Sequence, residues 1–203
     1  MLEASGLECE RGGRVLFRGL SFALGRGELL RIAGANGRGK TSLLRILCGL
    51  AAPAAGEVRW RGQEVGALRE EYSRQLVYLG HAPALKDDLT ALENLMFAWL
   101  LAGKGMPVPS DSLFQALRKL DVPMTLQVKK LSQGQRRRAL LARLVLSEEQ
   151  PLWLLDEPFA ALDTEAARIV EDLVSAHVGR GGMVIYTSHQ ESRMAGREMR
   201  LDA

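Results

Sequence analysis

The stretch Gly34-Ala35-Asn36-Gly37-Arg38-Gly39-Lys40-Thr41 decides the fold of this chain. It follows an apolar run, 29–33, which predicts a buried strand, and its last residue opens 41–48, whose apolar spacing predicts a helix. Such a strand, glycine-rich loop and helix form a phosphate-binding P-loop, because backbone N–H groups and the positive end of the helix dipole can both face an anion. Lys40 supplies a charge for the β- and γ-phosphates, and Thr41 supplies a hydroxyl for Mg²⁺. We therefore assign nucleotide binding to Gly34, Ala35, Asn36, Gly37, Arg38, Gly39, Lys40, Thr41 and Ser42.

The alternative is a glycine-rich turn that carries Lys-Thr by chance. Four fixed positions match by chance on the order of once in tens of thousands of starting positions, so a chain of this length would rarely contain such a match. The loop alone leaves kinases, GTPases and transport ATPases open, because all of them bind nucleotide phosphates in this way.

Composition favours one domain over residues 1–203, with room for a small inserted lobe. Apolar residues make up 47% of the chain and charged residues 25%, which is an ordinary globular mixture. The formal net charge of +3 is too small to favour nucleic-acid binding. We expect no signal peptide, because the start of the chain has neither a basic segment nor a long apolar core. We expect no membrane span, because no run of 18 apolar residues occurs. Cys9 and Cys48 lie far apart without metal-ligand spacing, which favours a reducing cytoplasm.

The start of the chain predicts short strands separated by glycine turns, and helices predominate farther along. Thr90 is a candidate N-cap with Glu93 at the capping-box position, which predicts a helix to about residue 101. Ser110 or Asp111 would cap a second helix that runs to about residue 120. We therefore expect a helical subdomain over about 82–148 within a sheet protein.

A second strong signal is the segment Pro151-Leu152-Trp153-Leu154-Leu155-Asp156-Glu157-Pro158. Four consecutive apolar residues suit a strand that is buried on both faces of a parallel sheet. Carboxylates at its C-terminal end would lie beside the P-loop, where open α/β sheets bind ligands. The segment is typical of a Walker B motif, in which Asp156 holds Mg²⁺ and Glu157 polarises the attacking water.

The segment Leu131-Ser132-Gln133-Gly134-Gln135 precedes a helical pattern over 135–147. Ser132 and the backbone N–H of Gly134 stand where this helix begins, which is a second anion site. One chain has no evident need for two γ-phosphate sites, but two chains placed head to tail could each complete the other's pocket. Taken alone, the segment is better explained as an N-cap serine before an amphipathic helix.

The P-loop, 131–135, the Walker B segment, Ala161-Leu162-Asp163 and His189 stand in the order that is typical of ATP-binding cassette (ABC) ATPases. The sequence resembles that family over nearly its whole length. The resemblance implies an α/β P-loop NTPase fold, an ABC-type nucleotide-binding domain with a mixed sheet core, an N-terminal antiparallel β subdomain and a helical subdomain. It also implies that 131–135 is the signature motif contacting the partner subunit's ATP through Ser132, Gly134 and Gln135. Asp163 would belong to the D-loop at the dimer interface, and His189 would be the switch histidine near the γ-phosphate.

Two positions depart from the usual ABC pattern. His81, in Tyr78-Leu79-Gly80-His81, stands where the Q-loop glutamine is usual, and a neutral imidazole can still bond to water or Mg²⁺. The aromatic residue that usually stacks on adenine has no clear counterpart. Its position falls near Arg11, whose guanidinium can stack on a base.

Longer strings resemble the cytochrome c biogenesis ATP-binding export protein family, the haem-exporter ATPases. They are Leu7-Glu8-Cys9-Glu10-Arg11, Tyr78-Leu79-Gly80-His81-Ala82-Pro83, Leu89-Thr90-Ala91-Leu92-Glu93-Asn94-Leu95 and Thr187-Ser188-His189-Gln190. In that family a histidine is expected at the Q-loop position, so His81 supports the resemblance. The resemblance implies ATP and Mg²⁺ as cofactors, a homodimer of ATPase subunits, and integral membrane permease subunits as partners. It places the chain peripherally on the cytoplasmic face of the inner membrane, where ATP hydrolysis is coupled to haem export or to release of haem from its carrier.

On this interpretation, Glu157, His189 and Lys40 are the catalytic residues, and Thr41 and Asp156 hold the metal. Three alternatives stay open at this point. One is an ABC ATPase acting on nucleic acid or ribosomes, although such proteins usually carry two cassettes or a long insertion. Another is an exporter ATPase for a different substrate. The third is a small-molecule kinase, which would have no use for 131–135 or for Glu157.

Overall fold

A computed structural model describes residues 1–82, 84–189 and 194–201 of the chain. Pro83 and Gln190, which belong to two of the strings quoted above, lie outside the described residues. The chain forms two compact units. The sheet unit comprises Met1–Tyr78, Gln150–Glu157 and Ala176–Ala203, and the helical unit comprises Leu79–Glu149 and Pro158–Ser175.

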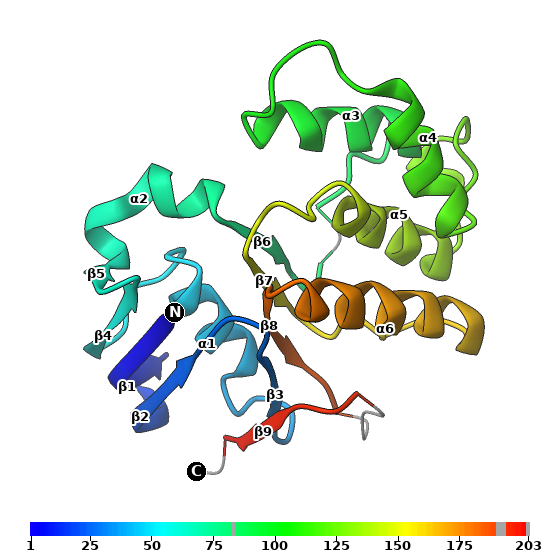
Figure 1. Cartoon of the computed structure of the whole chain (residues 1–203). Helices are drawn as coiled ribbons and strands as arrows, with labels where there is room; N and C mark the ends of the chain where they lie inside the picture. The colour runs from blue at the N-terminus through cyan, green and yellow to red at the C-terminus, as the bar shows by residue number, and fades with distance from the viewer. Residues whose placement is uncertain (83, 190–193, 202–203) are drawn as a thin grey trace. The chain divides into compact units, whose positions relative to one another are not determined.

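A five-stranded sheet positions the predicted P-loop and Walker B segments (Figure 1). Its strand order is β6-β7-β8-β3-β9, and the pairs β7–β8, β8–β3 and β3–β9 are parallel. Every residue of β7 and of β8 is buried, as expected for strands covered on both faces. Because parallel strands end at the same edge of a sheet, the segments after β3, β7 and β8 meet there. The strands are β3 (Leu29–Ala33), β6 (Leu76–Leu79), β7 (Leu152–Leu155), β8 (Met183–Thr187) and β9 (Arg197–Arg200).

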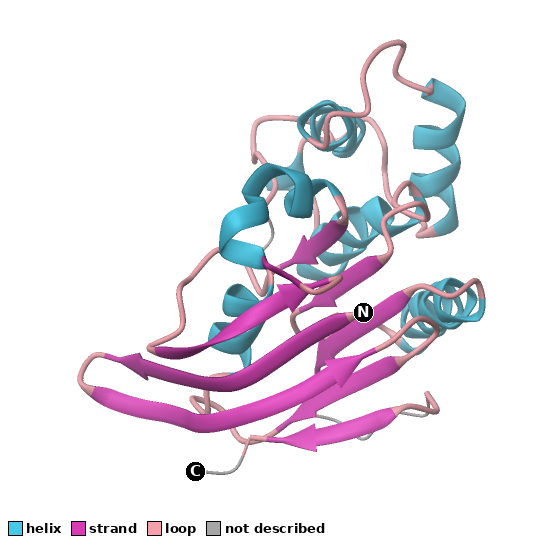
Figure 2. Cartoon of the chain, turned by 60° about the vertical axis from the view of Figure 1, so that its left-hand side comes forward, coloured by secondary structure: helices cyan, strands magenta, loops and turns pink. Residues whose placement is uncertain are grey.

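A second, antiparallel sheet confirms the β subdomain expected near the N-terminus (Figure 2). Its order is β2-β1-β4-β5, and a glycine turn, Gly12-Gly13, joins β1 and β2. These two strands have 10 and 11 residues, so the prediction of short strands is wrong for them. Gly56 is required where two strands of this sheet approach, because a Cβ there would stand 2.4 Å from the Gly6 carbonyl oxygen. The strands are β1 (Leu2–Arg11), β2 (Arg14–Leu24), β4 (Ala55–Trp60) and β5 (Gln63–Glu64).

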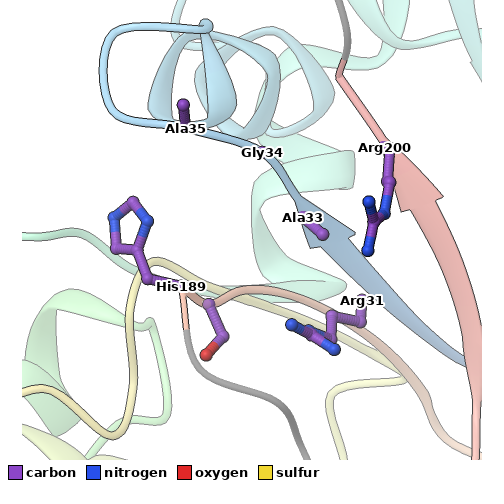
Figure 3. Close-up of a pocket in the computed structure, with 7 residues that line it drawn as sticks. Arg31, Ala33, Gly34, Ala35, His189 and Arg200 are labelled. Atoms are coloured by element: carbon purple, nitrogen blue, oxygen red, sulfur yellow. The ribbon is translucent and has the colours of Figure 1, made fainter.

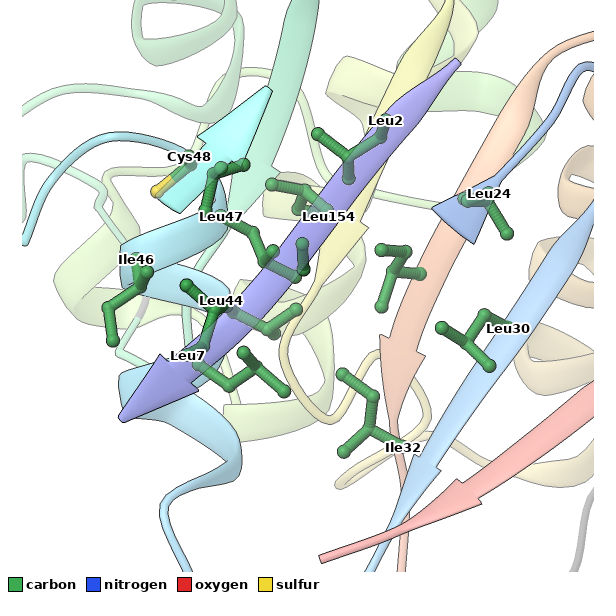
Figure 4. Close-up of a cluster of buried hydrophobic side chains, with 14 of the residues drawn as sticks. Leu2, Leu7, Leu24, Leu30, Ile32, Leu44, Ile46, Leu47, Cys48 and Leu154 are labelled. Carbon is green, nitrogen blue, oxygen red and sulfur yellow. The ribbon is translucent and has the colours of Figure 1, made fainter. Parts of the chain in front are cut away.

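The core of the sheet unit lies between helix α1 (Lys40–Leu47) and strands of both sheets (Figure 4). Leu44 and Leu47 of α1 pack in the same cluster as Leu7 of β1 and Leu154 of β7. This packing fixes the direction of α1, and with it the loop that precedes the helix.

Helix α2 (Val65–Arg74) is an element that the sequence did not predict. Its core-facing side chains, Val65, Leu68 and Tyr72, stand three and four positions apart, which is the apolar spacing of a helix, although the sequence analysis did not single it out. Tyr72 anchors the helix, since its hydroxyl donates to the Leu47 carbonyl over 2.7 Å and its ring lies 5.6 Å from that of Trp60.

The helical unit contains three helices that pack on one another, α3, α4 and α5 (Figure 1). The capping box of Thr90 and Glu93 at the start of α3 is confirmed. The predicted cap of α4 is wrong, because Pro109 is the N-cap and Ser110 is already helical. The unit also holds most of α6. The bounds are α3 (Ala91–Leu101), α4 (Ser110–Lys119), a 3₁₀ turn η1 (Val128–Lys130), α5 (Gln133–Val145) and α6 (Thr164–Gly179).

Candidate functional site

The loop after β3 has the backbone of a phosphate cradle. Gly39 is the N-cap of α1 with φ 93°, a left-handed conformation that favours glycine. A Cβ on Gly39 would also stand 3.0 Å from the Cβ of Leu16, so the position has both a conformational and a steric reason to be glycine. The loop thereby places the N-terminus of α1 on the inner side of its curve, where the free backbone N–H groups can face an anion.

Lys40 closes the loop upon itself. Its Nζ donates to the carbonyl oxygens of Gly34 at 2.7 Å and Ala35 at 3.2 Å, and only 7% of the residue is exposed. Burial lowers the pKa of the Lys40 ammonium, while the nearby charges of Glu157 and Asp156 raise it in part. The ammonium therefore stands among carbonyl oxygens that a phosphate could replace.

Asp156 joins three segments through its two carboxylate oxygens. Thr41 Oγ1 donates to Oδ2 over 2.7 Å, and Thr187 Oγ1 donates to Oδ1 over 2.7 Å. The Asp156 residue is 1% exposed, so this network is out of bulk water. The prediction that Thr41 and Asp156 lie together at the sheet edge is therefore supported by the observed geometry.

Thr187 is a site residue that the sequence analysis did not single out. Besides donating to Asp156, its Oγ1 accepts the backbone N–H of Glu157 over 2.8 Å. That bond holds Glu157, which has φ 49°, at the turn that ends β7. A threonine at the end of a β-branched strand is ordinary, so the sequence carries no signal for this role.

Glu157 and His189 are neighbours. His189 Nε2 lies 3.0 Å from Glu157 Oε1, and both ring nitrogens lie 3.4 Å from Lys40 Nζ. The Glu157 side chain is 15% exposed and that of His189 is 41% exposed. Lys40, Thr41, Asp156, Glu157 and His189 thus form one cluster within the sheet unit, and we call it the phosphate cluster.

The residues predicted for the second anion site and the D-loop lie in the helical unit, whereas Arg11, the predicted stacking partner of adenine, ends β1 in the sheet unit. Ser132 is the N-cap of α5, and it shares a capping box with Gln135, so α5 begins two residues before the predicted start at 135. Gly134 faces the segment before Asp163, because a Cβ there would stand 3.0 Å from the Ala161 carbonyl oxygen. Asp163 Oδ1 accepts the backbone N–H of Ala166 over 2.8 Å at the start of α6.

The segment that carries His81 is bonded to α5 within the helical unit. His81 is exposed. Its neighbour Gly80 accepts a bond of 3.2 Å from Arg137, a residue of α5 that is only 5% exposed. The segment that carries His81 is thereby linked to α5.

Two features are absent from residues 1–82, 84–189 and 194–201. No helix there is long and apolar enough to cross a bilayer. No three His, Cys, Asp or Glu side chains gather there to hold a metal ion.

Comparison with known families decides the classification. The ABC transporter family matches residues 17–160. The Cytochrome c biogenesis ATP-binding export protein CcmA of Aromatoleum aromaticum is 52% identical over 197 residues, covering 96% of this chain and 91% of its own length. This chain belongs to that family of ABC ATPases. Its counterparts in Dechloromonas aromatica and Pseudomonas aeruginosa are each 49% identical, covering 99% and 94% of this chain and 100% and 94% of their own lengths.

Solved ABC structures share the fold of this family member. An ABC transporter ATP-binding protein from Pyrococcus furiosus aligns with a TM-score of 0.84 and 22% identity over 98% of this chain and 96% of its own. The cassette MJ0796, solved as a dimer, aligns with a TM-score of 0.82 and 22% identity over 94% of this chain and 88% of its own. The expected ABC-type α/β fold is confirmed. As an ABC ATPase of the export family, the chain binds and hydrolyses ATP.

Proposed function

We propose that this ABC ATPase drives a membrane complex for cytochrome c biogenesis, coupling ATP hydrolysis to haem export or to release of haem from its carrier. One observation carries the proposal. About half of the residues, over nearly the whole chain, are identical to those of proteins named for cytochrome c biogenesis export. The intact phosphate cluster supports a working ATPase rather than a binding module.

Glu157 is the proposed general base. The attacking water bonds to the γ-phosphorus as the bond from that phosphorus to the ADP oxygen breaks, and Glu157 accepts the proton that the water loses. His189, 3.0 Å from Glu157, orients the water and the γ-phosphate. Lys40 exchanges its carbonyl partners for β- and γ-phosphate oxygens, which neutralises charge that develops in the transition state.

The oxygen donors of the phosphate cluster fit Mg²⁺. Thr41 Oγ1 and Asp156 Oδ2 lie 2.7 Å apart, and Mg²⁺ is ordinarily held by one or two protein oxygens together with waters and substrate phosphates. We propose that Thr41 and Asp156 hold it, Asp156 through a water. When bound, Mg²⁺ neutralises phosphate charge. The remaining P-loop residues, Gly34, Ala35, Asn36, Gly37, Arg38, Gly39 and Ser42, then bind the phosphates of ATP.

A second copy of the chain is the proposed partner at the nucleotide. The N-terminus of α5, with Ser132 and Gly134, offers an anion site, and two copies placed head to tail would present it to each other's ATP. Asp163 and Gln135 belong to the same proposed interface. His81 takes the Q-loop role, and Arg11 is the proposed stacking partner of adenine.

Membrane permease subunits are the proposed partners outside the ATPase pair. We place the chain on the cytoplasmic face of the inner membrane, bound peripherally to those subunits. The helical subdomain over about 82–148, with His81 near its start, would receive their coupling element.

The test is ATP turnover by the chain alone and with membrane proteins that a tag on it co-purifies from its host. Lys40→Ala should abolish turnover, whereas Arg74→Ala, at an exposed position on α2, should leave it unchanged. The host carrying Lys40→Ala should also lose c-type cytochromes. Recovery with RNA instead of membrane proteins, or unchanged c-type cytochromes, would overturn the proposed role while leaving the ATPase intact.

A further inference from the structure

The two histidines proposed at the nucleotide are held in different ways. His189 lines a pocket together with Gly34 and Ala35 of the P-loop (Figure 3). Its ring lies 3.0 Å from Glu157 Oε1, so contacts of its own side chain help to fix it. The His81 side chain is exposed and makes no hydrogen bond or ion pair within the part of the chain that the structure describes. The place of His81 therefore depends on what holds its backbone.

Arg137 holds the backbone directly before His81. Its Nη1 donates to the Gly80 carbonyl over 3.2 Å, from a position on α5 that is 57 residues later in the sequence. Both residues belong to the helical unit, and Arg137 is only 5% exposed. Because one planar peptide unit contains the Gly80 carbonyl and the N–H of His81, a bond to that carbonyl restrains the direction in which His81 follows.

Asn94 holds the other end of the same segment. The Lys86 N–H donates to Asn94 Oδ1 over 2.7 Å, and Asn94 Nδ2 donates to the Lys86 carbonyl over 3.0 Å. Asn94 is 8% exposed and belongs to α3, which packs on α5. The segment over 80–86 is thus bonded at both ends to buried side chains of two packed helices. His81 is next to the bond from Arg137 and five positions from the bonds of Asn94, so Arg137 restrains it more directly.

Packing alone does not explain why residue 137 is an arginine. A buried guanidinium loses hydration, and this loss is costly unless hydrogen bonds compensate for it. An apolar side chain of similar length, such as methionine, would fill the space without that cost. The neighbouring side chains of Arg136 and Arg138 are 33% and 16% exposed, and each pairs with an aspartate. The deeper burial of Arg137 therefore favours a role for its bond to Gly80.

We propose that Arg137 is a positioning residue for His81. It bonds the peptide before His81 to α5, so the imidazole keeps one place relative to the helix whose N-cap is Ser132. The proposal rests on the Q-loop role proposed above for His81, in which the imidazole bonds to water or Mg²⁺. Arg137 acts through His81 and needs no contact with the nucleotide.

The experiment compares ATP turnover by the full chain in the wild type, Arg137→Met, His81→Ala and the double variant. Arg137→Met should lower kcat by roughly 10- to 100-fold, because a misplaced group loses most of its effect. KM for ATP should change little, since Lys40 and the P-loop bind the phosphates. The double variant should be no slower than His81→Ala, because a residue that acts only through His81 has nothing left to position.

Two further variants separate positioning from a general effect of the substitution. Arg137→Lys should recover part of the lost kcat, because an ammonium can donate to the same carbonyl. Arg168→Gln, at an exposed position on α6 in the same unit, is the control and should keep the kcat of the wild type.

Hydrogen exchange of the nucleotide-free chain tests the position of the segment independently of activity. Backbone amides over 81–86 should exchange faster in Arg137→Met than in the wild type, because the bond that holds the segment to α5 is gone. Amides of α6 should exchange at the same rate in both proteins, which shows that the variant is folded.

Wild-type kcat in Arg137→Met, or equal exchange over 81–86, would overturn the positioning role. So would a double variant that is slower than His81→Ala by the full factor seen in Arg137→Met, since Arg137 would then act elsewhere. If Arg137→Met does not fold, Arg137→Lys takes its place, and its smaller loss of kcat should also vanish in the His81→Ala background. The predicted kinetics in a chain whose Lys40→Ala variant leaves c-type cytochromes intact would retain the role of Arg137 and reject the proposed membrane function instead.

Discussion

His189 Nε2 and Glu157 Oε1 lie 3.0 Å apart at the ends of two neighbouring parallel strands. The same imidazole lies 3.4 Å from Lys40 Nζ, so it stands between a carboxylate and an ammonium. An imidazole in that place can accept from the ammonium or donate to the carboxylate, depending on its tautomer. This relationship connects the proposed base to the proposed phosphate ligand through one side chain.

His189→Ala should lower kcat by roughly 10²-fold, because the water and γ-phosphate lose the group that orients them. His189→Gln should retain part of the activity, since an amide can still bond to both neighbours. KM for ATP should change little in either variant, because Lys40 and the loop backbone bind the phosphates. Steady-state phosphate release measures both constants. A rise in KM at unchanged kcat would assign His189 to ATP binding instead.

Thr187→Val should cost about 1–3 kcal/mol of folding free energy, because the N–H of Glu157 and one oxygen of Asp156 lose their bonds to a buried hydroxyl. ATP turnover should also fall in Thr187→Val, because the backbone N–H of Glu157 loses the hydroxyl that holds it in place. Thr187→Ser is the matched control, because it keeps the hydroxyl and should stay near the wild type. Urea unfolding and turnover together check this prediction. Equal stability of the valine and serine variants would show that the hydroxyl has no such role.

Gly134→Ala should impair pairing of two copies on ATP. Its new Cβ would stand 3.0 Å from the Ala161 carbonyl, so the segment leading to Asp163 must shift. Gly179→Ala is the control, because no atom lies within 4 Å of a Cβ there. Light scattering with ATP, in a Glu157→Gln background that slows hydrolysis, would report the dimer. If the Gly134→Ala variant formed a dimer as stable as that of the Gly179→Ala control, the signature segment would not belong to the interface.

The buried imidazole of His177 should make stability depend on pH. It stacks on Trp153 at 3.8 Å with ring planes 6° apart, and burial, aided by Arg180, lowers its pKa from 6.5 to about 4. The unfolded chain therefore binds the proton more readily, so stability should decline as pH falls from about 6.5 to about 4, by up to roughly 3 kcal/mol. His177→Phe keeps a stacked ring without the titration. The difference in unfolding free energy between the wild type and this variant should shift in favour of the variant as pH drops, and a constant difference would refute the prediction.

Sequence reasoning located the phosphate cluster because its members follow strong local signals. A P-loop and an apolar strand ending in Asp-Glu each mark the carboxyl end of a strand, and parallel strands bring those ends together. His189 needed the family resemblance, since one histidine after a strand carries little information by itself.

Other elements carry weaker local signals. Strand β9 consists of Arg197-Glu198-Met199-Arg200, an edge strand without an apolar face, and β-strand periodicity does not detect it. Helix α2 depends on Tyr72, whose importance comes from a bond to a carbonyl in α1. Thr187 was missed because its role depends on atoms that are distant in the sequence. The placement of β9, α2 and Thr187 thus depends on contacts between residues that are far apart in the sequence.

The central claim, that Glu157 is the base of an ATPase whose phosphate cluster lies in the sheet unit, is tested most directly by Glu157→Gln. ATP turnover and equilibrium binding of ATP should be measured on the same preparation, with the exposed Glu165→Gln of α6 as the control. Turnover should fall by roughly 10²- to 10⁴-fold while ATP affinity stays within about twofold of the wild type, because glutamine keeps the shape but cannot accept the proton. Full turnover in Glu157→Gln would show that Glu157 is not the base.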